Sequence, residues 1–164
     1  RDQGFTRSLY EALDQLAVAR RAEGDKLAKV IEDRLAEIAA LTEAAASSAA
    51  AQPAAARERL KKLLRLLLDA EPSLPEERLA QEAALAATRA DVTEELERLS
   101  MHVAAMRALL QGAGVGRQLD FLCQELNREA NTLCSKAADM ELTRTGLALK
   151  SAIEQLREQI QNVE

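Results

Sequence analysis

The sequence predicts an all-α protein built from long antiparallel amphipathic helices with coiled-coil-like packing. Of its 164 residues, 48% are hydrophobic but only 2% are aromatic, whereas strands are enriched in aromatic and β-branched residues. It contains only 6 Gly and 3 Pro, the residues that most often interrupt helices. Apolar residues also recur at steps of three and four along most of the chain, which is the spacing of one helix face.

The first half is predicted to form a helical hairpin. A helix is expected over about residues 5–45, and a short apolar helix over residues 57–69. Between them, Pro53 disfavours helical geometry at the preceding residue, so a turn is predicted inside this Ala-rich connector. The apolar seam of the first helix consists of Leu9, Leu13, Leu16, Leu27, Ile31, Leu35, Ile38 and Leu41.

The second half is predicted to form three further helices. A turn over residues 71–75 precedes a helix that runs to about Leu110, and Ser73 and Glu76 have the spacing of a capping box at its start. The Gly-rich stretch 112–116 is interpreted as a hinge. Helices are then expected over about residues 117–138 and 142–163, with a break near residues 139–141; the alternative is one continuous helix. These elements suggest a helical hairpin over residues 1–72 and a C-terminal helical domain over residues 73–164.

Composition limits the classes of function. The net charge of −5 provides no long-range attraction for nucleic acid or for an anionic membrane. Cys123 and Cys134 lie too far apart on one predicted helix for a disulfide, so they are interpreted as small apolar residues in a reducing compartment. No apolar run is long enough to span a bilayer and no signal peptide is recognisable. We therefore expect a cytoplasmic protein with no membrane partner.

One candidate constellation lies along the helix that precedes the hinge. Asp91, Glu95, Arg98 and His102 follow helical spacing and form one stripe. Two carboxylates one turn apart repel each other unless a cation lies between them, and Arg98 or a divalent metal could supply that charge. The alternative interpretation is a salt-bridged helix edge with a surface histidine.

A second constellation covers the helix after the hinge, where polar residues form two stripes beside a leucine seam. Amides beside carboxylates suit hydrogen bonding to bases, to phosphates or across a subunit interface, and the residues alone leave these alternatives open. The first stripe contains Asp120, Gln124, Asn127, Arg128, Asn131 and Ser135. The second contains Glu125, Arg128, Glu129, Thr132 and Lys136.

Four segments share one resemblance. They are RADVTEELERLSMHV (89–103), RQLDFLCQELNREANTLCSKAAD (117–139), ALKSAIEQLREQIQNVE (148–164) and, more loosely, AVARRAEGDKLAKVIEDRL (17–35). They resemble the YicC family of bacterial endoribonucleases, most specifically its C-terminal region. The resemblance implies a divalent-metal-dependent endoribonuclease that uses Mn²⁺ or Mg²⁺, cleaves single-stranded RNA and assembles as a homo-oligomer, a hexameric ring. The family's N-terminal domain has no counterpart here and the chain begins at Arg1, so we expect a C-terminal fragment.

Residue roles follow from what this chemistry requires. Metal-assisted phosphodiester cleavage needs oxygen ligands, a group that transfers protons and cations that stabilise phosphate charge. Five carboxylates could supply the oxygens: Asp91, Glu95, Asp120, Glu125 and Glu129. Of these, we expect Asp91, Glu95 and Asp120 as metal ligands. The expected catalytic residues are His102, Glu125 and Glu129, with His102 as the proton shuttle. The expected RNA-binding residues are Arg98, Arg117, Gln124, Asn127, Arg128, Asn131 and Lys136.

Two other functions are compatible with the same residues. The segment could be an oligomerisation and interaction module whose catalytic residues lie in the missing domain, so that the polar stripes form subunit contacts. It could also be a structural coiled-coil adaptor, which would tolerate substitution of its polar residues.

Overall fold

The computed structural model describes residues 2–70, 76–89, 91–112, 114–137 and 139–161. These residues form five helices and no strand, which confirms the all-α fold class. The helices are α1 (Asp2–Ala70), α2 (Glu76–Arg89), α3 (Thr93–Leu109), α4 (Gly116–Lys136) and α5 (Met140–Ile160). None of these described helices combines the length and the apolar character that a membrane span requires.

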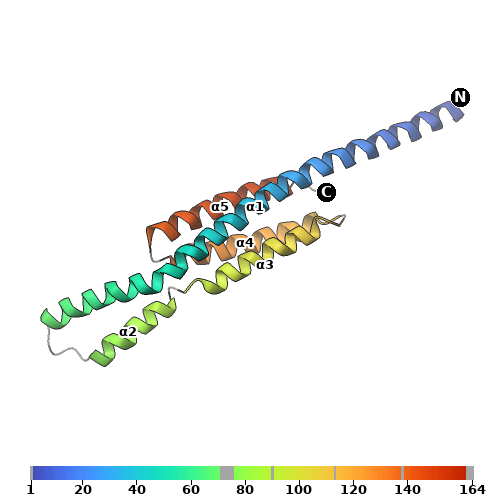
Figure 1. The fold of residues 1–164 in the computed structure, drawn as a ribbon. Coiled ribbons are helices and arrows are strands. Elements are labelled where there is room, and N and C mark those ends of the chain that lie inside the picture. The colour runs from blue at the N-terminus through green and yellow to red at the C-terminus, as the bar shows by residue number, and fades with distance from the viewer. Residues whose placement is uncertain (1, 71–75, 90, 113, 138, 162–164) are drawn as a thin grey trace.

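The middle of α1 forms a four-helix bundle with α3, α4 and α5. Each helix packs against two neighbours, in the cyclic order α1, α3, α4 and α5, and neighbours run in opposite directions (Figure 1). Leucine and isoleucine side chains such as Leu35, Leu99, Leu126 and Leu149 form its continuous hydrophobic core. The expected domain boundary at residue 72 lies outside the described residues, and this core joins residues from both sides of it.

The N-terminal part of α1 extends beyond the bundle (Figure 1). Its amphipathic stripe continues there, but Leu9, Leu13 and Leu16 are about half exposed. From Ile31 onwards the same stripe packs against the bundle, with Ile31, Leu35 and Ile38 buried and Leu41 partly buried. The predicted seam is therefore confirmed as a packing face from Leu27 onwards, and its N-terminal part stays a prediction.

The predicted turn near Pro53 is wrong, because α1 is one helix from Asp2 to Ala70. Proline removes one backbone hydrogen bond from a helix interior and usually bends it, although its fixed φ is itself helical. Alanine, which has the highest helix propensity, surrounds Pro53 and favours continuation of the helix. Figure 1 shows that α1 changes direction where its colour passes from teal to green, and α2 lies beside the part that follows.

The single helix predicted from residue 76 to about Leu110 is also wrong, because it is interrupted between α2 and α3. Asp91 lies in this interruption, where its Oδ1 accepts hydrogen bonds from the Thr93 amide (3.0 Å) and the Thr93 hydroxyl (2.7 Å). Such a local hydrogen bond to the backbone offers an alternative to the helix and is typical of helix starts. The turn at 71–75, with Ser73 of the expected capping box, lies outside the described residues.

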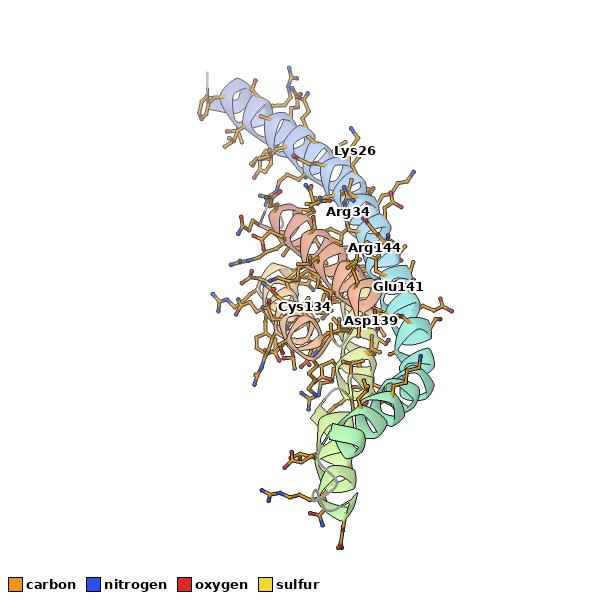
Figure 2. All side chains as sticks on the ribbon, turned by 90° about the vertical axis from the view of Figure 1, so that its left-hand side faces the viewer. Lys26, Arg34, Cys134, Asp139, Glu141 and Arg144 are labelled. Carbon is orange, nitrogen blue, oxygen red and sulfur yellow. The ribbon has the colours of Figure 1, made fainter. Side chains whose placement is uncertain are left out.

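The predicted connectors on both sides of α4 are confirmed. The Gly-rich stretch separates α3 from α4, and Gly114 adopts a positive φ of 68° that other residues rarely adopt. At the other end, Asp139 caps α5 by accepting a hydrogen bond from the Leu142 amide at 2.8 Å. Figure 2 shows Asp139 beside the start of α5.

Gly146 lets α5 pack closely against α4. A Cβ added there would lie 2.6 Å from Cys134 Sγ and 3.0 Å from Leu133 Cδ2. We expect Gly146→Ala to destabilise the bundle by about 1 kcal/mol, because this clash outweighs the gain in helix propensity. The Cys134→Ala/Gly146→Ala double variant should recover that loss. Urea denaturation measures both, and equal destabilisation in the single and double variants would contradict the clash.

A candidate metal centre between helices α3 and α4

The interface between α3 and α4 has an apolar centre and a polar edge. Leu99 and Val103 of α3 are buried in the same core as Leu126 and Leu133 of α4. Because positions three, four and seven residues apart lie on one face of a helix, each helix also directs a row of polar residues to the edge of this contact. From α3 these are Glu95, Arg98 and His102, and from α4 they are Glu125, Glu129 and Lys136.

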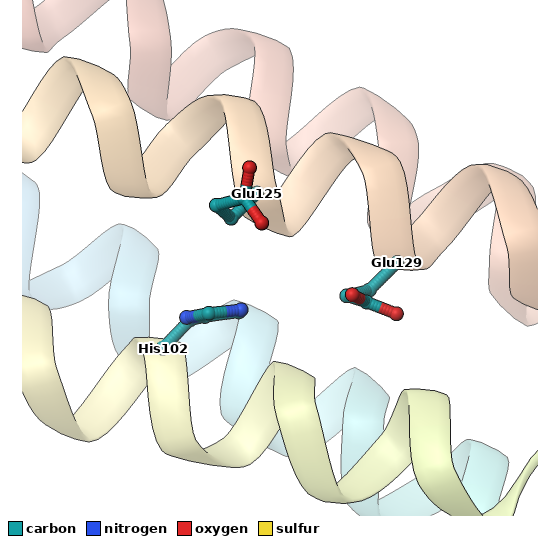
Figure 3. A group of neighbouring side chains, drawn as sticks. All are labelled: His102, Glu125 and Glu129. Carbon is teal, nitrogen blue, oxygen red and sulfur yellow. The ribbon is translucent and has the colours of Figure 1, made fainter.

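Three of these side chains converge on one point. One ligand atom each from His102, Glu125 and Glu129 lies within 4.8 Å of the other two. His102 projects from α3 towards the two carboxylates, which lie one turn apart on α4 (Figure 3). Glu129 is buried, with 4% of its surface exposed, and the other two are half-buried. In the part of the chain that the structure describes, this is the one group of metal-ligating side chains brought so close together.

The donor set of this group fits a divalent cation. Two carboxylates held together, one of them buried, repel each other and need positive charge nearby. Ligands about 2.1 Å from a common ion lie up to about 4 Å from one another, so only small side-chain shifts would be needed. One imidazole with two carboxylates suits a first-row transition ion better than Mg²⁺, which prefers ligand sets made of oxygen alone.

Arg98 supplies part of the positive charge next to this group. Its Nη1 lies 3.3 Å from Glu129 Oε1, and its Nη2 contacts Glu94. The hydrogen bond to Glu129, together with the charge of Glu94, raises the pKa of the Arg98 guanidinium further above its ordinary value. Arg98 therefore contacts one carboxylate oxygen of Glu129, Oε1.

The three expected metal ligands are not brought together. Asp91 is occupied by Thr93, whose hydroxyl and amide hydrogen bonds lower the pKa of the Asp91 carboxyl. Glu95 is buried and pairs with Lys136, whose Nζ lies 2.8 Å from its Oε1. Asp120 accepts a hydrogen bond from Gln124 at 2.9 Å and faces Arg157 of α5, with 3.8 Å between Oδ1 and Nε. The residues expected to be catalytic thus form the candidate metal centre instead.

The expected RNA-binding residues of α4 differ in how far they are exposed. Arg117, Gln124, Arg128 and Asn131 are exposed on α4, whereas Asn127 is half-buried and accepts a hydrogen bond from Asn131 at 3.2 Å. Lys136 is instead part of the contact between α3 and α4. Besides Glu95, its Nζ contacts the backbone carbonyl of Asp91 at 3.0 Å, and the hydrogen bond to Glu95 raises the pKa of Lys136.

Both cysteines are free thiols, in agreement with the predicted absence of a disulfide between them. Cys123 is buried in the core, and this desolvation raises its pKa to about 12. Desolvation also raises the pKa of the half-buried Cys134. A thiol that stays protonated is a poor nucleophile and a poor metal ligand, so both cysteines have packing roles.

The fold and the site define an all-helical protein in which one histidine and two glutamates converge between two helices. The chain belongs to the YicC family, because the family model described as "Endoribonuclease YicC-like, C-terminal" matches residues 43–164.

Two relatives extend the similarity to nearly the whole chain. A probable endoribonuclease YicC of Haemophilus influenzae is 44% identical over 163 residues, which are 99% of this chain and 56% of that protein. A probable endoribonuclease YicC of Clostridioides difficile is 36% identical over 161 residues, which are 98% of this chain and 55% of that protein. The chain thus spans a little over half the length of these relatives.

Proposed function

We propose that this chain provides the metal centre and the RNA-binding surface of a divalent-metal-dependent endoribonuclease. The observation that carries the proposal is the convergence of His102, Glu125 and Glu129 between α3 and α4. The names of the two relatives, both probable endoribonucleases, support the reaction class. When bound, a divalent cation supplies Lewis-acid stabilisation of the charge that develops on the phosphate.

The remaining roles belong to residues around this centre. Arg98 contacts Glu129 and is partly exposed, so its guanidinium can hold Glu129 in place and face a bound phosphate. Arg117 and Arg128 are exposed on α4 and can contact the phosphates of a strand that crosses the centre. Gln124 and Asn131 supply amide groups for hydrogen bonds to bases. We assign the substrate as single-stranded RNA, whose bases are accessible to such groups.

A metal titration of the full-length protein tests the proposal. We expect Mn²⁺ to bind with a stoichiometry of one ion per chain and more tightly than Mg²⁺. A His102→Ala/Glu125→Gln/Glu129→Gln variant should lose this binding in isothermal calorimetry. Asp120→Asn is the matched control, because Asp120 also lies on α4 but contacts Gln124 and Arg157. Unchanged Mn²⁺ binding in the triple variant would contradict the proposed centre.

A second candidate function, a homo-oligomerisation module, is favoured by the projecting part of α1. Phe5, Leu9, Leu13 and Leu16 form one exposed apolar stripe there, and an amphipathic helix of this kind can pack against a second copy. This function is compatible with the first. Oligomerisation would be the only function of this chain if substitutions in the His-Glu-Glu group altered the assembled mass but left RNA cleavage and its metal dependence unchanged.

A further inference from the structure

Helix α4 differs from its neighbours in the chemistry of its exposed face. Its exposed side chains are cationic, amide, hydroxyl or aromatic, and none is acidic, although the chain carries a net charge of −5. The three carboxylates of α4, Asp120, Glu125 and Glu129, are half-buried or buried. The exposed residues of α4 are Arg117, Gln118, Phe121, Gln124, Arg128, Asn131 and Ser135.

The neighbouring helices α3 and α5, in contrast, have exposed carboxylates. On α5, Glu141, Glu154 and Glu158 are exposed, and on α3, Glu94 and Glu97 are exposed. A solvated helix face ordinarily mixes both signs of charge. The carboxylates of α4 are half-buried or buried, and Asp120 faces Arg157. Its exposed face, with two arginines and several amides, is therefore suited to a polyanion.

Phe121 is the apolar exception on this face, with 58% of its surface exposed. It lies one helical turn before Glu125, about 6 Å along the helix axis. Arg117 precedes it by four residues and Arg128 follows it by seven, so all three share one side of α4. A single exposed hydrophobic residue is unremarkable by itself. This ring, however, has an arginine before it and another after it on the same side of α4, and it lies one turn from Glu125 of the candidate metal centre.

We propose that Phe121 is a stacking platform for an unpaired base of the RNA strand that lies along the exposed face of α4. Base–aromatic stacking tolerates any sequence, because every base has a π-face, and it requires the base to be free of a duplex. Phe121 would thus position the nucleotide next to the phosphate at the metal centre and restrict the substrate to single strands. The position of this nucleotide relative to the cleaved bond rests on the proposed function, whereas stacking itself does not.

The test measures stacking without metal, so that failure of the metal centre cannot obscure it. Full-length protein in EDTA is titrated into a short single-stranded RNA containing 2-aminopurine, whose fluorescence is quenched by stacking. We expect Phe121→Leu to weaken binding about tenfold and to abolish the quenching, because a leucine keeps the apolar bulk but has no π-face. Phe121→Trp should retain both. Binding of a duplex of equal length should be the same in all three proteins.

Leu147→Ala is the matched control, because Leu147 on α5 has the same exposed fraction of 58% and should not affect binding. In Mn²⁺, Phe121→Leu should raise the KM for cleavage more than it lowers kcat. Unchanged affinity of Phe121→Leu for the single strand would overturn the proposal. So would weaker binding that coincides with a changed assembled mass in light scattering, since Phe121 would then be a protein contact.

Discussion

Glu129→Gln is expected to reduce Mn²⁺-dependent RNA cleavage by about 100-fold or more while the protein remains folded. The amide has nearly the shape of the carboxylate, so the packing of this buried residue between α3 and α4 is retained. Its oxygen can still accept the hydrogen bond that Arg98 donates to Glu129 at 3.3 Å. A neutral amide is, however, a weaker ligand for a divalent cation, and metal chemistry depends on the ligand set.

The stability of the same variant provides an independent measurement. Metal that binds only the folded state adds about 2.7 kcal/mol to the free energy of unfolding at a concentration of 100 times Kd. Glu129→Gln should lose this increment. Without metal, its free energy of unfolding should equal or slightly exceed that of the parent protein, because one of two neighbouring carboxylates has been neutralised.

Glu97→Gln serves as the control for both measurements, since Glu97 is an exposed carboxylate of α3 outside the group. Full cleavage activity in Glu129→Gln, with the metal-dependent stabilisation preserved, would exclude Glu129 as a ligand. A loss of activity accompanied by metal-free unfolding would show instead that Glu129 has a structural role.

Lys136→Met is expected to lower the free energy of unfolding by about 2–4 kcal/mol. The side chain of Glu95 is only 7% exposed and pairs with Lys136 at 2.8 Å. Its second oxygen, Oε2, is buried without a hydrogen-bond partner. Removal of Lys136 would therefore leave a buried carboxylate without compensation, which is costly. The expected loss in the free energy of unfolding is smaller than for a fully buried pair, because 30% of the Lys136 side chain is exposed.

The Glu95→Leu/Lys136→Met double variant should recover most of this loss, because a buried ion pair replaced by apolar residues is often as stable as the pair. Lys26→Met is the control, since Lys26 is exposed on the projecting part of α1 (Figure 2). Chemical denaturation separates the three variants. If Lys136→Met is as stable as Lys26→Met, the pair with Glu95 makes no net contribution. Weaker RNA binding by Lys136→Met would then indicate the direct contact that we expected from the sequence.

The ends of α4 and α5 could be predicted within a few residues, because local signals mark them. The Gly-rich stretch precedes Gly116, and Asp139 has the side chain of a helix cap. The interruption at Asp91 was missed because the apolar periodicity continues across it. The turn predicted at Pro53 failed for the opposite reason, since one local signal was given more weight than the helix propensity of its neighbours.

The members of the candidate site could be selected from the sequence, but their grouping could not. Helical periodicity placed Glu95 and His102 on one stripe and therefore suggested a shared role. Their partners are set by the register between α3 and α4, which directs Glu95 to Lys136 and brings His102 near Glu125 and Glu129. That register depends on packing between the two helices, and no pattern within either helix reports it. Phe121 was missed for another reason: the leucine seam indicated the buried side of this helix, but only the polar residues outside the seam were considered as site residues.

The division of the His-Glu-Glu group between two helices limits how the sequence can change in evolution. An insertion of one residue in α4 before Glu125 would rotate the rest of the helix by about 100° and move both carboxylates away from His102. An extra residue in the loop between Leu109 and Gly116 would be absorbed outside the helices. Length variation among descendants of this gene should therefore accumulate in that loop, while the number of residues from Gly116 to Glu129 stays constant.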